Sequence, residues 1–177
     1  DGFRFADAPA PLLVEQGSYD EAMPLFTEAL EGLRRVVGAE HPQTLVMVIN
    51  MGALHFKQGK YDEAMPYHAE ALEVTRRVLG DEHPYTLISI KNMGNLLGKQ
   101  GRYEEAMPYL NEVLETNRRV MGDEHPSTLD SITSMGHLLV EQGKYDEAMP
   151  HYVKALEANR RVLGDEHPST LDSITSM

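Results

Sequence analysis

The chain has 177 residues, is 41% hydrophobic and carries a formal net charge of −12, which disfavours nucleic acids and anionic membrane surfaces as main partners. Cysteine is absent, which excludes disulfides, thiolate metal sites and cysteine nucleophiles. No apolar run approaches the roughly 18 residues of a membrane span and no signal-peptide pattern opens the chain, so we expect a cytoplasmic protein.

A repeat with a period of 42 residues runs through the chain. Its most regular mark is a Glu-His-Pro triplet, whose prolines stand at positions 42, 84, 126 and 168. Residues 123–129 return unchanged as residues 165–171, and a glycine and a pair of arginines keep the same spacing. A fixed period of this size indicates stacked units that cannot bury their apolar faces alone.

We expect residues 12–177 to form one solenoid. It consists of a partial repeat 12–42, full repeats 43–84, 85–126 and 127–168, and a truncated repeat 169–177. Residues 1–11 do not follow the pattern, because Pro9 and Pro11 fall where later repeats have helix interior, and proline breaks a helix there. We interpret residues 1–11 as a non-repeat N-terminal segment, either a degenerate cap or a remnant of cloning.

Each full repeat is predicted to contain two helices. In repeat 43–84 the first helix is predicted over about residues 42–58. Pro42 suits the first helical position, where a missing N–H costs nothing, and Gly59 ends the helix in a left-handed conformation. Spacings of three and four residues predict one buried apolar stripe. It comprises Leu45, Val48, Met51, Gly52 and His55.

The second helix is predicted over about residues 61–79 and ends at Gly80. Pro66 lies early in this helix, so we expect it to cost at most one hydrogen bond. Gly52 and Ala64 lack bulk and are expected to let the two helices approach closely. Because Met65 recurs in every repeat, we assign it and its equivalents at 23, 107 and 149 to the core. The predicted buried stripe is Ala64, Met65, Ala71, Leu72, Val78 and Leu79.

The repeat pattern resembles that of tetratricopeptide repeat (TPR) proteins. In one repeat the matching positions are Val48, Met51-Gly52, His55, Ala64 and His68. In another they are Ile132, Met135-Gly136, Leu139, Ala148 and Tyr152. The period of 42 instead of 34 resembles that of kinesin light chains and related scaffold proteins. The resemblance implies an all-α fold, an α-solenoid of antiparallel helix pairs in a right-handed superhelix, that serves protein–protein interaction.

Candidate binding residues lie where the repeats stop agreeing. Repeats 85–126 and 127–168 differ in the first helix at positions that include 88, 91, 95 and 98, which share one face opposite the packing stripe. In TPR proteins the corresponding face lines a concave groove for a partner's peptide. Drift on any solvated surface would give the same variability, and this explanation stays open. The candidate groove residues are Val46, Ile49, Asn50, Ala53, Phe56, Lys57, Ile88, Lys91, Asn92, Asn95, Lys99, Asp130, Thr133, His137 and Glu141.

These residues lead to the hypothesis that an extended peptide lies along the groove. Phe56 would contact an apolar anchor of that peptide, and Lys91 and Lys99 would receive an acidic group. The alternative is a self-assembling array, because residues 169–177 begin a further first helix that lacks its partner and leave an apolar end exposed. The partner is therefore expected to be a protein or peptide, with end-to-end self-association as the second expectation.

Neither a metal site nor a catalytic site is predicted. Four of the eight histidines belong to the repeated triplet, one per repeat, and none has a second ligand at helical spacing, so a structural role is favoured. The sequence contains no glycine-rich phosphate loop and no Ser-His-Asp arrangement. We expect a protein that is not an enzyme and needs no cofactor.

Overall fold

A computed structural model describes residues 9–167 and residue 170. Every regular element in that part of the chain is an α-helix, as an all-α fold requires. The chain divides into two compact units, an N-terminal unit Asp1–Ser89 and a C-terminal unit Ile90–Met177, and the boundary falls within one helix. That the repeats form one continuous solenoid over residues 12–177 stays a prediction.

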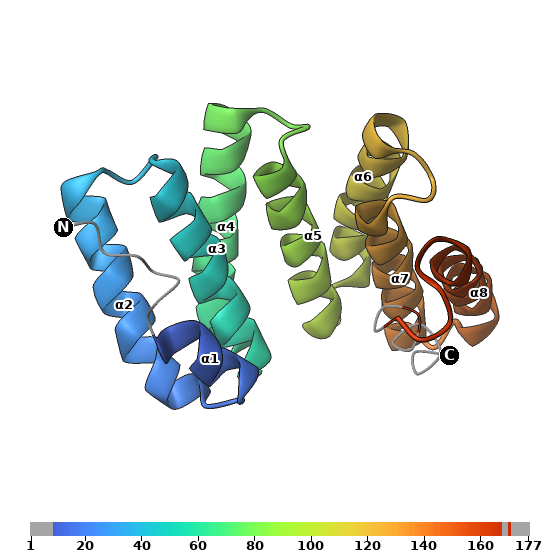
Figure 1. Cartoon of the computed structure of the whole chain (residues 1–177), viewed down its shortest axis with the longest axis horizontal. Helices are drawn as coiled ribbons and strands as arrows, with labels where there is room; N and C mark the ends of the chain where they lie inside the picture. Colours follow the sequence, from blue (N-terminus) through green and yellow to red (C-terminus); the bar gives the residue numbers. More distant parts are fainter. Residues whose placement is uncertain (1–8, 168–169, 171–177) are drawn as a thin grey trace. The chain divides into compact units, whose positions relative to one another are not determined.

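The N-terminal unit is a series of antiparallel helices in which α1 packs against α2, α2 against α3 and α3 against α4 (Figure 1). The two helices predicted for repeat 43–84 are confirmed, one of them to the residue. The unit contains α1 (Pro9–Glu15), α2 (Tyr19–Val36), α3 (Pro42–Lys57), α4 (Tyr61–Leu79) and the first residues of α5 (Pro84–Lys99).

The C-terminal unit repeats this arrangement. Helix α6 packs against α7 and α7 packs against α8, in the same alternation of first and second helices. Besides the rest of α5, the unit contains α6 (Tyr103–Met121), α7 (Pro126–Glu141) and α8 (Tyr145–Leu163).

The start of α1 differs from the sequence prediction. The helix begins at Pro9, so the expectation that Pro9 and Pro11 exclude a helix was wrong. Both prolines lie in the first turn, where backbone N–H groups have no intrahelical acceptor and none is lost.

The repeated Glu-His-Pro loop begins each first helix. His125 is the N-cap of α7, and its Nδ1 accepts a hydrogen bond from the Ser127 backbone N–H at 3.2 Å. Thr128 then donates from Oγ1 to the Gly122 carbonyl at 2.7 Å and closes the loop. The same contacts recur at His41 and His83, and at Thr44 and Thr170. These bonds give the loop histidines the structural role that the sequence favoured.

Close helix contact depends on a glycine in the first helix and one large residue in the second. A β-carbon added to Gly52 would lie 2.6 Å from two ring atoms of His68. The same clash occurs between Gly94 and Leu110 at 2.7 Å. The glycine thus makes room for the residue sixteen positions later. These large residues are all buried: His68, Leu110 and Tyr152.

Two assignments to the core were wrong. Val78 is 41% exposed, because it lies near the C-terminal end of α4 beyond the residues that α3 covers. Met65 and its equivalents are half-buried, and Met149 is 43% exposed. Repetition at one position marks a shared environment, which here is the edge of a helix and not its buried centre.

Candidate peptide-binding surfaces

In the N-terminal unit, the candidate residues of α3 form a mainly apolar strip. Val46, Asn50, Ala53 and Phe56 are half-buried, and Lys57 is exposed. Ile88, at the start of α5, is 39% exposed. Ile49 is instead only 7% exposed and belongs to the hydrophobic core with Phe26 and Met47.

Phe56 is not a free apolar side chain. The centroid of its ring lies 5.5 Å from that of Tyr61. The preceding residue, His55, stacks on Tyr67 with 5.4 Å between the ring centroids. A ligand would therefore contact one face of a preformed aromatic pair, which costs little side-chain entropy.

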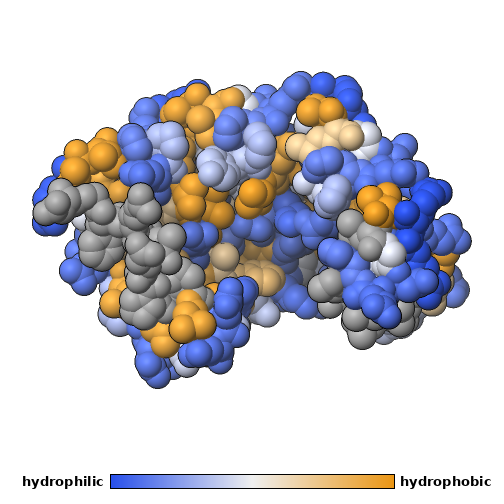
Figure 2. Space-filling model, in the orientation of Figure 1, coloured by the Kyte–Doolittle hydropathy of each residue, from blue (hydrophilic) through white to orange (hydrophobic). Residues whose placement is uncertain are grey.

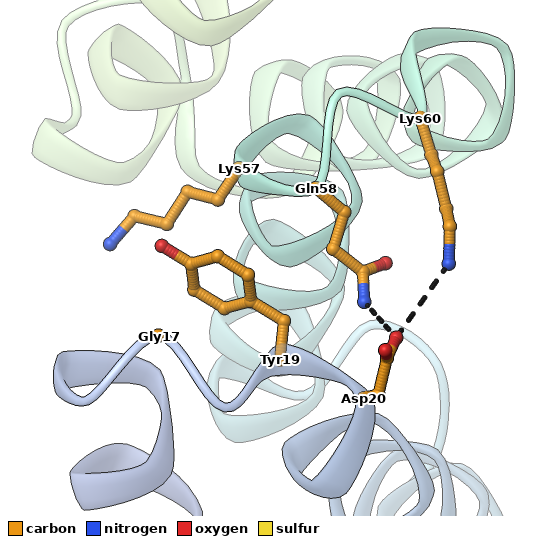
Figure 3. A pocket seen from close by; sticks show the side chains of 6 residues that line it. All are labelled: Gly17, Tyr19, Asp20, Lys57, Gln58 and Lys60. Carbon is orange, nitrogen blue, oxygen red and sulfur yellow. Dashed lines mark hydrogen bonds and ion pairs between the residues drawn. The ribbon is translucent and has the colours of Figure 1, made fainter.

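An open pocket of about 390 Å³ lies at the turns that precede α2 and α4. Gln58 Nε2 donates to Asp20 Oδ1 at 2.9 Å, and Lys60 Nζ lies 4.0 Å from the same oxygen. Figure 3 shows Lys57 extending across the hydroxyl end of Tyr19. Of the lining residues only Lys57 was predicted, although the repeated Gln-Gly-x-Tyr-Asp segment at residues 16–20 and 58–62 was a usable signal. The lining comprises Gly17, Tyr19, Asp20, Lys57, Gln58 and Lys60.

In the C-terminal unit, the two lysines of α5 are paired with carboxylates of α7. Lys91 forms an ion pair with Asp130, and Lys99 Nζ lies 2.5 Å from Glu141 Oε1. Tyr103 adds a hydrogen bond from its hydroxyl to the Glu141 carbonyl at 2.7 Å. The basic and acidic candidate residues thus neutralise each other across adjacent repeats.

The remaining candidates of this unit are polar and reachable. Asn92, Asn95 and Thr133 are half-buried and His137 is exposed. Thr133 donates to the Leu129 carbonyl at 3.0 Å. Partial desolvation, followed by the charge of Lys99, lowers the pKa of His137, which disfavours its charged form.

Two positions that the helical spacing placed on this face are part of the packing. A β-carbon added to Gly98 would lie 2.9 Å from Leu138, and Ser134 is only 7% exposed. The face of a first helix that is open to solvent is therefore narrower than the pattern of sequence differences suggested.

Two other features, a metal site and a membrane-spanning helix, were sought among residues 9–167 and 170. No group of three or more histidines and carboxylates is arranged to hold a metal ion in this part of the chain. No described helix is long and apolar enough to cross a membrane. The face drawn in Figure 2 is mostly hydrophilic, with several separate hydrophobic patches.

Comparison with known families decides the class of protein. Models of the tetratricopeptide repeat match residues 12–43, 44–119 and 89–160. The chain belongs to the tetratricopeptide repeat family. A comparison with curated protein sequences gives no match.

Solved TPR structures share the fold of this TPR chain. The structure of BtubC (BKLC) from P. vanneervenii is 20% identical, with a TM-score of 0.77, and the match covers 94% of this chain and 66% of that one. A kinesin light chain-like protein of Podosopora anserina with nearly identical TPR-like repeats is 23% identical, with a TM-score of 0.76 and 94% and 79% coverage. A variant of that protein with one substituted residue gives the same values. The chain spans just under two thirds of the BtubC chain, so the likeness concerns the repeats and their fold.

Proposed function

We propose that this TPR chain binds an extended segment of a partner protein along the solvent-facing side of its first helices. TPR domains generally mediate protein–protein interaction, which makes a protein the expected kind of partner. The observation that carries the proposal is the contrast between the two faces of these helices. Residues that pack, such as Gly94 and Gly136, recur unchanged, whereas the half-buried Asn95 and the exposed His137, at one equivalent position, differ.

The first helices of each unit offer their own chemistry to a bound segment. The α3 strip around Val46, Ala53 and Phe56 suits an apolar side chain. In the C-terminal unit, Asn92 and Asn95 provide both donors and acceptors for a peptide backbone.

The ion pairs revise the idea that Lys91 and Lys99 receive an acidic group. Each lysine already has a carboxylate partner, and an acidic ligand would have to displace Asp130 or Glu141. Exposed pairs of this kind contribute about 0–1 kcal/mol, so displacement is feasible but gains little affinity. We therefore propose that this face recognises the peptide backbone of the partner and not its charge.

We further propose that the chain acts as a cytoplasmic scaffold without a cofactor or a catalytic step, and that neither nucleic acid nor membrane is its partner. The formal charge of −12 supports the exclusion of polyanions.

A peptide library displayed on phage and selected on the purified chain tests the proposal. Selected peptides are measured by fluorescence anisotropy against Phe56→Ala and Asn95→Ala. The matched control is Asn111→Ala, which changes an exposed asparagine on α6. We expect a loss of about fivefold or more in affinity for one of the first-helix variants and none for the control. Unchanged affinity in both first-helix variants would disprove the groove.

Self-assembly through repeat ends is the second candidate, because α8 presents an apolar strip. Tyr145, Met149 and Val153 are 66%, 43% and 36% exposed. In α6 the equivalent tyrosine, Tyr103, donates to the Glu141 carbonyl of the following repeat. Sedimentation velocity over a wide concentration range tests this role. Association that Met149→Glu abolishes and Phe56→Ala leaves intact would favour self-assembly over the groove.

A further inference from the structure

The repeated arginine pair near the end of each second helix takes part in a recurring set of ion pairs. In the N-terminal unit, Arg34 Nη2 contacts both carboxylate oxygens of Glu70, at 2.5 and 2.6 Å. The glutamate lies thirty-six residues after the arginine, on the next second helix. Its equivalents in two other repeats are also glutamates, at positions 28 and 112. The fourth copy of this position is Lys154.

Lys154 reverses the charge that faces an arginine. Arg118 precedes Lys154 by thirty-six residues, just as Arg34 precedes Glu70. The two cations instead share one carboxylate oxygen, Oδ1 of Asp123, at 3.2 Å from Arg118 Nε and 3.5 Å from Lys154 Nζ. One negative charge thus faces two positive charges on α6 and α8.

His151 lies beside this pair on α8. Burial lowers the pKa of His151, and the positive charges of Arg118 and Lys154 lower it further. The equivalent positions in α4 and α6 are tyrosines, Tyr67 and Tyr109. The cation cluster is defined here as Arg118 and Lys154, with Asp123 as its anchoring carboxylate.

The acidic residues around the cluster do not account for the difference in charge between this repeat and the others. Glu115, Glu147 and Glu157 lie one turn away on the same helices, but each of these positions is a glutamate in every repeat. Relative to the other repeats, the site has therefore gained two units of positive charge in a chain whose formal net charge is −12.

The cluster is open to solvent. The side chains of Arg118, Lys154 and Asp123 are 39%, 49% and 65% exposed. Arg118 contacts Asp123 through Nε, and a guanidinium has five N–H donors in a fork that matches a carboxylate. Two cations that share one exposed carboxylate have N–H donors left to bind a second carboxylate.

We propose that the cation cluster on α6 and α8 binds a carboxylate side chain of an acidic segment in a partner protein. This surface lies on second helices and is separate from the first-helix face that is proposed above for the peptide. The ligand differs as well, because the cluster recognises the charge of a side chain and not a peptide backbone.

A fluorescein-labelled tetraglutamate peptide is the probe, with tetraglutamine as the uncharged comparison, both at low ionic strength. We expect the glutamate peptide to bind and Lys154→Glu to weaken that binding about tenfold. The matched control is Lys144→Glu, which makes the same change in net charge on an exposed lysine before α8 and should cost less than about twofold. Because Lys154→Glu recreates the arginine–glutamate pair seen at Arg34 and Glu70, its thermal midpoint should be equal to or above that of the wild type.

Three results would overturn the proposal. They are equal binding of the two peptides, an equal loss in Lys144→Glu and Lys154→Glu, and a loss that follows Lys91→Gln instead of Lys154→Glu. The last result would move the acidic ligand to the first-helix face. Asn95→Ala is expected to leave tetraglutamate binding unchanged, so failure of either proposed site can be recognised separately.

Discussion

The buried histidine of α4 should make the N-terminal unit sensitive to acid. His68 is 1% exposed, its Nδ1 has no hydrogen-bond partner, and burial lowers its pKa to about 4. The unfolded chain binds a proton near pH 6.5, whereas the folded chain does not until about pH 4. Stability is therefore present above pH 6.5 and is lost as the pH falls through this window.

The loss can be worked out from the two pKa values. Proton binding to the unfolded state alone lowers the free energy of unfolding by about 0.2 kcal/mol at pH 7, about 2 at pH 5 and about 3 at pH 4. His68→Leu removes this dependence, and the structure provides the precedent, because Leu110 occupies the same position against Gly94 in the C-terminal unit. The variant also removes an unpartnered buried nitrogen, which should stabilise the protein by about 1 kcal/mol at pH 7.

Urea titrations of the wild type and His68→Leu at several pH values between 7 and 4, followed by far-UV circular dichroism, measure the difference. All carboxylates titrate alike in both proteins, so the difference curve isolates the imidazole. Leu110→His is the reciprocal variant and should give the C-terminal unit the same acid sensitivity. A difference between the wild type and His68→Leu that stays constant from pH 7 to pH 4 would refute this reasoning.

Three further predictions concern packing, the helix-starting loop and the cross-repeat ion pairs. Gly52→Ala should destabilise the protein by about 1–3 kcal/mol in thermal or urea unfolding, because its β-carbon clashes with the helix opposite. Gly32→Ala, where nothing lies within 4 Å, should instead stabilise it by about 0.5–1 kcal/mol; equal effects would contradict the close-packing argument. Thr128→Val should cost about 1 kcal/mol, because the Gly122 carbonyl loses its 2.7 Å bond and keeps only the 3.5 Å bond from the His125 N–H; a neutral result would show that water replaces the hydroxyl. A double-mutant cycle on Lys99 and Glu141 should give a coupling energy below about 1 kcal/mol that falls with salt; a larger, salt-independent value would show that the pair is desolvated.

The helices themselves were accessible from the sequence. Residues 42–57 and 61–79 show helical spacing and are each followed by a glycine. The first helix starts with a proline and the second has two acidic residues in its first turn, and these signals act over a few residues. Each glycine at a helix end, such as Gly59 and Gly80, adopts the positive φ that only a residue without a side chain takes up readily. Gly52 was recognised for its missing side chain, but its partner was assigned to the small residue Ala64 and not to the large His68.

Sequence spacing was a poor guide to the exposed edge of a helix. Ile49 and Val78 are the clearest cases, since one is core and the other exposed, against prediction. Periodicity defines the direction in which a side chain leaves its own helix. It does not define how far a neighbouring helix extends over that side chain, and this depends on the packing of whole helices.

The sequence by itself determined the repeat, the family, the all-α fold and the ends of the helices, because local backbone preferences and a regular apolar pattern decide them. Tertiary structure alone decided which charges meet. Lys91 and Asp130 are separated by 39 positions, and Lys154 and Asp123 also come from different parts of the chain. Pairing turned a basic strip and an acidic strip on the first helices into a neutral face, and it left Arg118 of α6 and Lys154 of α8 sharing the single carboxylate of Asp123. Coulomb interactions depend on distance in space, which becomes defined only when the helices have packed.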